Sequence, residues 1–399
     1  MESPLQSLRN LFHALMGWED EDLMPVDFVM SSYLTGFLPG SVEKAWGDLC
    51  GPPSIGKSEI LRALDDGQQR TVMVDTLTEN AFSSAMRDPE DPDKDFSLLY
   101  QLSDSRPPRG PKVLVIKEFS TLMNMRREKS DKIFADLRAA YDGSYATAAG
   151  NIGLDTKTDL NFGMLTACTE KLDEFRRTNQ TLGERTLVCR IGRNTRSFKS
   201  RTAISNQVIR EDRAKKFALR ARIRGSVHKA LNEAIVRIHR TRGRVGRSDA
   251  LSARVAMLAT IATSVRTTPL SERNYANMAE GPARFLLQLT AWGDCRVLFD
   301  ARDKWDDDDY SLVRRIAQDT MPPESLRVIH TLYKFYGAIE GGCTLDEVYL
   351  DAQVESSFYR QLRQWAIIGI VDWDKDNLVR LHPDFADALT ASRFTEGLI

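Results

Sequence analysis

The 399-residue chain, with 42% hydrophobic and 28% charged residues and a formal net charge of −1, has the composition of a globular protein of two or three domains. No apolar run is long enough to span a bilayer, and the first residues lack the basic flank and apolar block of a signal peptide. We therefore expect a cytoplasmic protein with no membrane partner. The five cysteines are too widely spaced for a metal cluster, so buried reduced thiols are expected.

The first part of the chain predicts a helix and then an α/β core. Apolar residues from Leu5 to Met16 recur at helical spacing, within a predicted helical lead-in over residues 1–45. Short apolar segments then alternate with helical patterns over residues 46–196, which predicts a parallel sheet covered by helices on both faces. The strands are predicted at 46–50, 71–75, 113–117, 161–167 and 186–191, and the helices at 57–64, 118–141 and 171–182.

The later part of the chain predicts a surface insertion, a basic helical domain and a C-terminal domain. Residues 86–110, rich in proline and acids, predict a long surface insertion. A basic helical domain is predicted over residues 197–320, with helices at 214–239 and 250–265. After Pro322-Pro323, three predicted helices and two apolar segments around a turn predict a winged-helix-like domain over residues 321–399. Those helices are expected at 325–336, 345–350 and 356–367, and the turn at 374–377.

The most specific motif is a phosphate-binding loop, whose eight residues are Gly51, Pro52, Pro53, Ser54, Ile55, Gly56, Lys57 and Ser58. It fits G-x-x-x-x-G-K-[ST] at every position, between a predicted strand and a predicted helix. Its glycines let backbone N–H groups point at phosphate oxygens, beside the positive end of the helix. We expect ATP to bind here, with Lys57 on the β- and γ-phosphates and the Ser58 hydroxyl on Mg²⁺. An ordinary glycine turn is the alternative.

A single carboxylate stands where ATPases usually carry two. The strand predicted at 113–117 ends in Lys117-Glu118, and Glu118 can hold Mg²⁺ or polarise the attacking water, but hardly both. Asp75, at the end of the neighbouring predicted strand, is the candidate for the second task. Lys117 could neutralise charge or contact a phosphate. The alternative is a buried strand that ends in a surface Lys-Glu pair.

Polar residues after the last two predicted strands could complete the site. Thr166 or Thr169, at the tip of the strand at 161–167, could sense the γ-phosphate. Arg185 precedes the final strand, where its permanently charged, forked guanidinium could project toward the nucleotide of a neighbouring subunit. A salt-bridged surface arginine is the alternative for Arg185.

Basic residues gather in the predicted helical domain. Between Arg193 and Arg247 the chain carries 17 lysines and arginines against three acidic residues, which predicts contact with nucleic-acid phosphates. A solvated basic helix is the alternative, and base stacking is not expected there. The candidate DNA-binding residues are Arg213, Lys215, Lys216, Arg220, Arg222, Arg224, Arg240, Arg242, Arg244 and Arg247.

The order of these motifs resembles AAA+ and related P-loop ATPases, and most closely a group from phages and mobile elements whose acid-bearing strand ends in Lys-Asp-Phe. The resemblance covers GPPSIGKS, IKEF, LRAAYDGSY, TACT and GER, and extends to EGPARFLLQLTAW at 280–292. It implies an AAA+ strand order, Thr169 as a γ-phosphate sensor, Arg185 as an arginine finger and Arg284 as an arginine that reaches back from a helical lid. Glu118 in place of aspartate and the missing second acid depart from the pattern.

The resemblance implies an ATP-hydrolysing homo-oligomer, a hexameric ring or a filament, that acts on DNA. It would serve as a helicase, helicase loader or DNA-remodelling factor of a phage or mobile element. The alternative is an ATP-dependent regulatory or defence switch whose C-terminal module binds a protein partner. Because only one acid is found, a processive motor and a slow switch both remain open. A nucleoside kinase is disfavoured, since no motif for an acceptor pocket is found.

Overall fold

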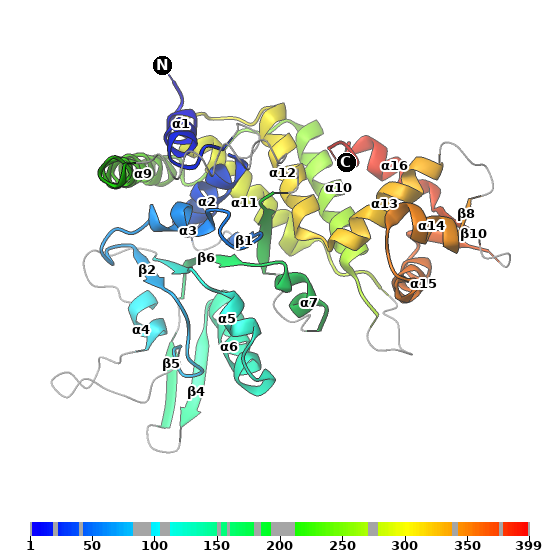
Figure 1. Ribbon diagram of the computed structural model, residues 1–399, viewed down its shortest axis with the longest axis horizontal. Coiled ribbons are helices and arrows are strands. Elements are labelled where there is room, and N and C mark those ends of the chain that lie inside the picture. Colours follow the sequence, from blue (N-terminus) through cyan, green and yellow to red (C-terminus); the bar gives the residue numbers. More distant parts are fainter. Residues whose placement is uncertain are drawn as a thin grey trace. The chain divides into compact units, whose positions relative to one another are not determined.

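The computed structural model describes twelve stretches of the chain and divides it into two compact units (Figure 1). The described residues are 2–18, 23–39, 43–82, 97–103, 112–149, 153–157, 160–178, 185–192, 212–269, 278–336, 342–374 and 378–397. The first unit contains Met1–Gly246 and Ala291–Trp305, and the second contains Arg247–Thr290 and Asp306–Ile399. The expected domain boundaries at 45 and 196 therefore fall inside the first unit, and the boundary at 320 falls inside the second.

The first unit is built on a five-stranded, all-parallel sheet in the order β2-β3-β6-β1-β7. The mixed α/β fold with a parallel sheet is thus confirmed. The strands are β1 (Trp46–Cys50), β2 (Thr71–Val74), β3 (Val113–Ile116), β6 (Gly163–Cys168) and β7 (Thr186–Arg190). Every residue of β1 is buried, as expected for a central strand of a sheet that is covered on both faces.

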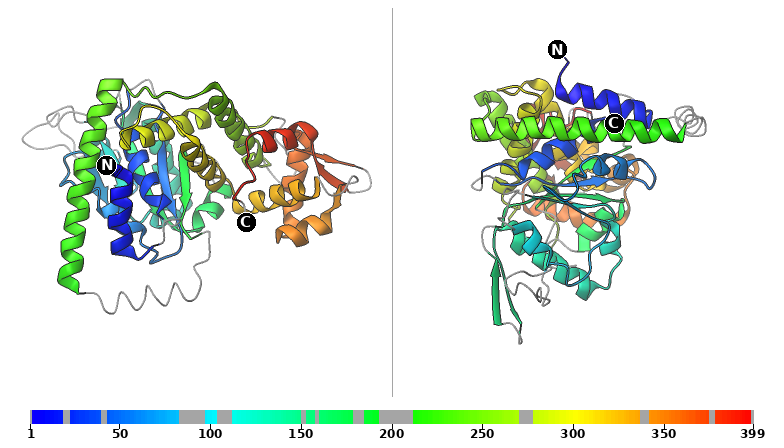
Figure 2. Two further views of the ribbon diagram at one scale, coloured as in Figure 1. Left: turned by 90° about the horizontal axis from the view of Figure 1, so that it is seen from above. Right: turned by 90° about the vertical axis from the view of Figure 1, so that its left-hand side faces the viewer.

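One face of the sheet is covered by α2 (Met24–Thr35), whose residues are almost all buried. The helices α1 (Pro4–Met16) and α9 (Arg213–Thr241) lie outside α2 (Figure 2). Asp27 on α2 is fully buried and accepts hydrogen bonds from Arg9 Nε at 2.8 Å and Arg296 Nε at 3.2 Å. Because a buried carboxylate needs such partners, this cluster joins α2 to α1 and to the second half of α11 (Ala283–Phe299).

The other face of the sheet is covered by four helices around an apolar core that includes Trp46, Ile116 and Phe134. They are α4 (Leu98–Ser103), α5 (Ser120–Met123), α6 (Arg127–Tyr141) and α7 (Lys171–Thr178). The single helix predicted over 118–141 is wrong, because α5 ends at Met123 and the backbone of Arg126 is extended, with ψ of 137°. Within the predicted insertion at 86–110, the prediction of a surface loop is wrong for residues 97–103, because they contain α4, whose Leu98, Leu99 and Leu102 are buried in this core. The other residues of 86–110 lie outside the described residues.

A separate antiparallel hairpin stands between α6 and β6 in the sequence. It consists of β4 (Tyr145–Ala149) and β5 (Gly153–Lys157), with Tyr145 opposite Lys157. These two strands are not part of the parallel sheet. The sequence analysis did not predict them.

The second unit begins with α10 (Asp249–Arg266), the first part of α11 and α12 (Asp307–Thr320). Its C-terminal part contains four α-helices, three before β9 and one after β10, and a small antiparallel sheet in the order β8-β10-β9. The elements are α13 (Pro323–Tyr336), β8 (Cys343–Thr344), α14 (Leu345–Ala352), the 3₁₀ turn Ser356–Phe358, α15 (Tyr359–Ile367), β9 (Val371–Trp373), β10 (Leu378–Leu381) and α16 (Pro383–Ala391). Residues 375–377 of the predicted turn lie outside the described residues.

Two findings concern membrane crossing and the cysteines. Among the described residues, no helix combines the length and the apolar character that a membrane crossing requires. The five cysteines are buried and form no disulfide, so the prediction of buried reduced thiols is confirmed.

Candidate nucleotide-binding site

The loop Gly51–Ser58 joins the interior strand β1 to α3 (Lys57–Arg62), so it lies at the carboxyl end of the sheet. Gly51 N–H donates to Cys168 O at 3.2 Å, which fixes the start of the loop against β6. Pro52, Pro53 and Ser54 are exposed. Since α3 begins at Lys57, the first N–H groups of this helix have no partner within the helix, as an anion site requires.

The Lys57 side chain folds into its own loop. Its Nζ donates to Gly51 O at 2.6 Å and to Pro52 O at 2.7 Å. Burial, the largest cause, lowers the pKa of Lys57, while the Cys168 and Cys50 thiols and then the carboxylates of Glu118 and Glu170 act in the opposite direction. The ammonium is therefore partly desolvated and held by neutral carbonyl groups, which phosphate oxygens can replace with stronger, charge-assisted bonds.

Gly56 is the position in the loop that requires glycine. Its φ is +101°, and a Cβ added there would lie 1.8 Å from Met16 Cε and 3.1 Å from Trp18 Cζ2. The end of α1 thus packs directly against the phosphate loop. The sequence analysis treated α1 as a lead-in only, and no local pattern indicated this contact.

The two carboxylates predicted at the ends of β2 and β3 differ in their surroundings. Asp75 forms an ion pair with Lys117, with 2.8 Å between Oδ1 and Nζ, although its side chain is 71% exposed. Glu118 is exposed, and within the described part of the chain its carboxylate forms no ion pair. The backbone N–H of Glu118 donates to Asp75 O at 3.2 Å, so the two strand ends are adjacent. Lys117 therefore neutralises the charge of Asp75, whereas the Glu118 carboxylate remains available to a metal ion or a water molecule.

The two candidate threonines, Thr166 on β6 and Thr169 just after it, have different surroundings. Thr166 is buried and donates to Asp48 Oδ1 at 2.6 Å, inside the sheet. Thr169 lies beyond the strand end, where its hydroxyl is 3.2 Å from Ser120 Oγ and its N–H donates to the same oxygen at 3.0 Å. Only Thr169 is thus placed at the carboxyl edge, beside the residues that follow Glu118.

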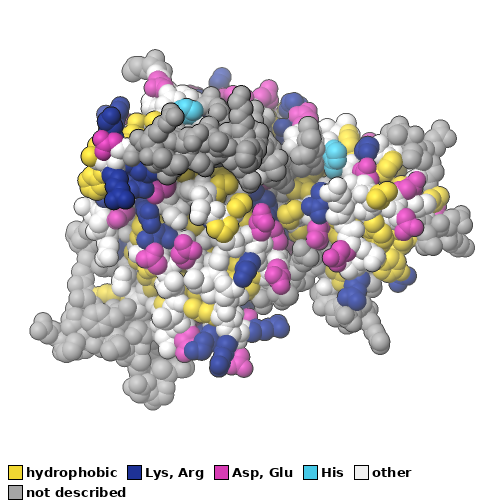
Figure 3. All heavy atoms as spheres, in the orientation of Figure 1, with side chains coloured by type: hydrophobic (Ala, Val, Ile, Leu, Met, Phe, Trp, Pro, Cys, Tyr) yellow, Lys and Arg dark blue, Asp and Glu magenta, His cyan; other side chains and the backbone are white. Residues whose placement is uncertain are grey.

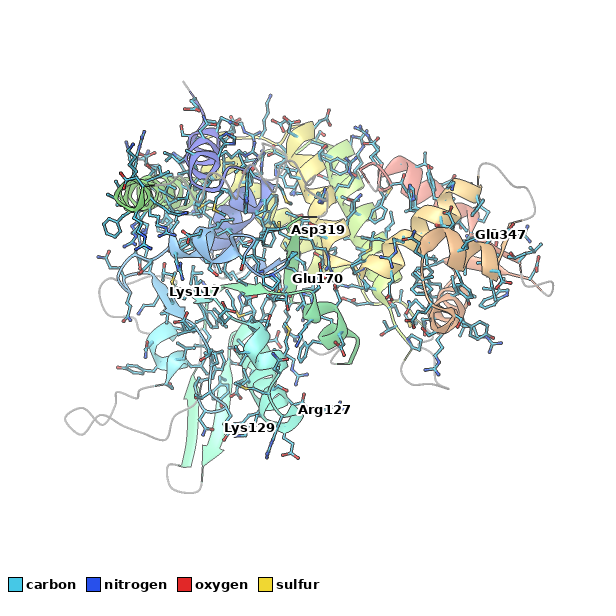
Figure 4. The ribbon with its side chains drawn as sticks, in the orientation of Figure 1. Lys117, Arg127, Lys129, Glu170, Asp319 and Glu347 are labelled. Carbon is cyan, nitrogen blue, oxygen red and sulfur yellow. The ribbon has the colours of Figure 1, made fainter. Side chains whose placement is uncertain are left out.

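Glu170 is a carboxylate that the sequence analysis missed. It is exposed, directly follows Thr169 and raises the pKa of Lys57 through its charge, as Glu118 does (Figure 4). Its position after the tip of β6 is the signal that could have identified it. Glu118 and Glu170 are therefore the two carboxylates that act electrostatically on the lysine of the loop.

The predicted arginines Arg185 and Arg284 belong to different units of the chain. The Arg185 side chain is 12% exposed, its Nη2 lies 3.0 Å from Asp142 Oδ2, and its guanidinium stands 5.7 Å from the centre of the Tyr141 ring. Reaching a neighbouring subunit would require this ion pair to open. Arg284 belongs to the first turn of α11, in the second unit, and is half-buried.

The predicted DNA-binding residues lie in two groups, which correspond to the two basic runs at 213–229 and 237–247 in the sequence. Along the 29 residues of α9, Arg220 and Arg240 are separated by 20 positions, or about 30 Å at 1.5 Å per residue. Most of the ten side chains are exposed, and Lys and Arg side chains are visible on the surface over α9 (Figure 3). Arg247 is the first residue of the second unit, whereas the other nine belong to the first.

The comparisons with known proteins add no relative. No protein-family model matches the chain, and no curated protein matches it.

Among the described residues, no three His, Cys, Asp or Glu side chains gather as a metal site. A Mg²⁺ ion held by the Ser58 hydroxyl, one carboxylate and phosphate oxygens needs no such cluster, because Mg²⁺ is usually bound through one or two carboxylates and substrate phosphates.

Proposed function

We propose that the chain is an ATP-binding and ATP-hydrolysing enzyme of the AAA+ type. The observation that carries the proposal is the complete phosphate loop at the carboxyl end of the interior strand β1, with Lys57 held by Gly51 O and Pro52 O. Ligands of parallel α/β sheets bind at this edge, because the loops and helix N-termini converge there. Phosphate oxygens would accept hydrogen bonds from the loop N–H groups and from Lys57.

The order of the strands supports this class. One strand, β6, lies between β1, which precedes the phosphate loop, and β3, which ends two residues before Glu118. The carboxyl ends of β1, β3 and β6 bring Lys57, Glu118 and Thr169 to one edge of the sheet. The same separation is what the resemblance to AAA+ ATPases leads us to expect.

The division of tasks follows from the geometry of the carboxylates. Bound Mg²⁺ would neutralise charge on the β- and γ-phosphate oxygens, and the Ser58 hydroxyl and Glu118 are the groups that would hold it. Glu170 is then better placed than Asp75 to orient a water molecule, because Lys117 already neutralises Asp75. Thr169 would report whether the γ-phosphate is present. In this proposal the second carboxylate, Glu170, follows β6 and is not adjacent in the sequence to the first, Glu118. Such an arrangement is consistent with slow hydrolysis.

The proposed substrate is DNA, and the proposed active form is a homo-oligomer. The basic helix α9 supports contact with phosphates, and three helices with a β8-β10-β9 sheet support a winged-helix-like domain at the C-terminus. In this proposal α10 and the first part of α11 form the lid that carries Arg284. The protein would serve as a helicase, a helicase loader or a DNA-remodelling factor.

One observation favours a second candidate, an ATP-dependent switch whose C-terminal module binds a protein. The helix α14 carries Asp346 and Glu347 one turn before Leu350, which is 82% exposed, whereas Asp351 forms an ion pair with Lys334 at 2.8 Å. Acidic groups around an exposed leucine repel phosphates and suit a basic or apolar protein surface.

Measuring ATP hydrolysis by the full chain, with and without DNA and at several salt concentrations, tests the proposal. DNA is expected to stimulate hydrolysis, and the stimulation is expected to fall steeply with salt because counterions compete for phosphates. Lys57→Ala serves as the inactive control. ATP binding that persists without any DNA binding at moderate salt would favour the switch, and the absence of nucleotide binding would refute both candidates.

A further inference from the structure

The first ten residues of α9 form an exposed helical arm, which we define as residues 213–222. None of them is buried, and Ile223 is the first buried residue of the helix. At 1.5 Å per residue the arm is about 15 Å long. Figure 2 shows α9 as one long helix on the outside of the first unit. The rest of the helix packs through apolar side chains, but the arm does not.

One side of the arm combines cations with an aromatic ring. Arg213, Lys216, Phe217 and Arg220, and Arg224 just beyond the arm, follow one another at intervals of one to four residues, which places them along one side of the helix. The Phe217 side chain is 75% exposed. The chain carries no acidic residue from position 213 to position 232. This side therefore presents a bare ring among positive charges.

The same side of the helix reaches the nucleotide site. Arg220 donates from Nε to Glu59 Oε2 at 2.9 Å and from Nη2 to Glu59 Oε1 at 2.7 Å. Glu59 lies in the first turn of α3, two residues after Lys57. A ligand that lies along the arm is thus in contact with a side chain that holds the helix of the phosphate loop.

We propose that the arm binds single-stranded nucleic acid, with a base stacked on Phe217 and phosphates on the neighbouring cations. This inference rests on the proposed action on DNA and specifies the form of the strand. Cations alone fit any phosphate backbone, but an exposed ring gains from a base face, which is accessible in a single strand and occupied by its neighbours in a duplex. The prediction that base stacking is absent from this run took no account of Phe217.

The test compares Phe217→Ala with Val236→Ala in the full chain. Val236 is also on α9 and 45% exposed, so it controls for loss of an exposed apolar side chain. The probes are a fluorescent 20-nucleotide oligothymidine, an abasic strand of the same length and a 20-base-pair duplex. Wild type is expected to bind oligothymidine more tightly than the abasic strand. Phe217→Ala is expected to lower oligothymidine affinity by about 5- to 150-fold, the usual range for one stacked base. Phe217→Trp and Val236→Ala are expected to bind oligothymidine as tightly as wild type.

The outcomes separate this inference from the proposed function. If wild type binds none of the three probes, action on DNA itself is refuted. If wild type binds them but Phe217→Ala leaves oligothymidine affinity unchanged, stacking on the arm is refuted while DNA binding stands. If Phe217→Ala changes the sedimentation of the free protein and not strand binding, the arm is an interface between copies of the chain. Loss of duplex binding in equal measure would also contradict the proposal.

Discussion

The phosphate loop and the acid-bearing strand ends lie at the same edge of the sheet, but their functional groups are preorganised to different degrees. The loop has its glycine in the required conformation and its lysine already inside, bonded to Gly51 O and Pro52 O. On the acid side, Asp75 is paired with Lys117, and Glu118 and Glu170 extend from separate strands. Affinity for ATP and the rate of hydrolysis therefore depend on different groups, and substitutions can change one without the other.

Glu118→Gln is expected to give the largest effect, on the acid side alone. Loss of the carboxylate should lower the hydrolysis rate by about 100- to 10,000-fold, the range that a positioned acid or base contributes. Single-turnover hydrolysis and equilibrium ATP binding measure the two effects. Retained affinity would assign Glu118 to the water, whereas affinity that falls only in the presence of Mg²⁺ would assign it to the metal. Unchanged hydrolysis would exclude both tasks.

Lys57→Ala is expected to give the next largest effect, on the loop side. Each charge-assisted hydrogen bond is worth about 1.5 to 3 kcal/mol, so losing two should weaken ATP binding by about 100-fold or more. Calorimetric titration with ATP checks this. Lys44→Ala is the matched control, because Lys44 is also a buried lysine whose Nζ donates to two backbone carbonyl groups, Leu38 O at 2.9 Å and Pro39 O at 3.4 Å, outside the loop. Tight ATP binding by Lys57→Ala would remove the basis for the phosphate site.

The pH dependence of binding sharpens the loop side further. Burial lowers the pKa of Lys57 below that of an ordinary lysine, so its charge is lost as pH rises through that lowered value. ATP affinity is expected to decline toward alkaline pH, by up to about tenfold per pH unit above this pKa. Lys57→Arg keeps its charge and should remove the decline. If the ATP affinities of wild type and Lys57→Arg declined equally between pH 7 and 10, a group other than Lys57 would be responsible for the decline.

Asp75→Asn is expected to give the smallest effect. The ion pair with Lys117 is largely exposed on the Asp75 side, so its loss should change the free energy of unfolding by about 0 to 1 kcal/mol. Hydrolysis should change by less than about threefold, and Glu170→Gln should lower it more. Urea unfolding and steady-state hydrolysis of both variants test this order. A larger loss of hydrolysis in Asp75→Asn would restore Asp75 as the second acid.

The sequence predicted what local patterns determine. The five strands of the sheet and the loop after β1 follow from apolar segments and one motif, and the structure contains them. The β4–β5 hairpin was missed because its segments, YATAA and GLDTK, are short and rich in small or polar residues. Helix breaks such as the one after Met123 depend on how the chain packs back onto the core, which spacing alone does not encode.

Contacts between strands could not be predicted in the same way. The pairing of Lys117 with Asp75 depends on β2 and β3 being neighbours, and the burial of Thr166 depends on Asp48 lying opposite it on β1. Arg185 is bound to Asp142, which lies at the end of another helix. By contrast, the basic run of the sequence contains Phe217, but only the structure shows that the Phe217 side chain is exposed.

The most direct test of the nucleotide site is a structure of the full chain with Mg²⁺ and a non-hydrolysable ATP analogue. The account predicts that the β-phosphate lies within the loop Gly51–Ser58, and that Lys57 Nζ has left Gly51 O and Pro52 O for phosphate oxygens. Ser58 should contact the metal, with Glu118 or Glu170 facing the γ-phosphate. An analogue bound elsewhere, or a loop that stays empty at saturating analogue with Lys57 still on its two carbonyl oxygens, would contradict it.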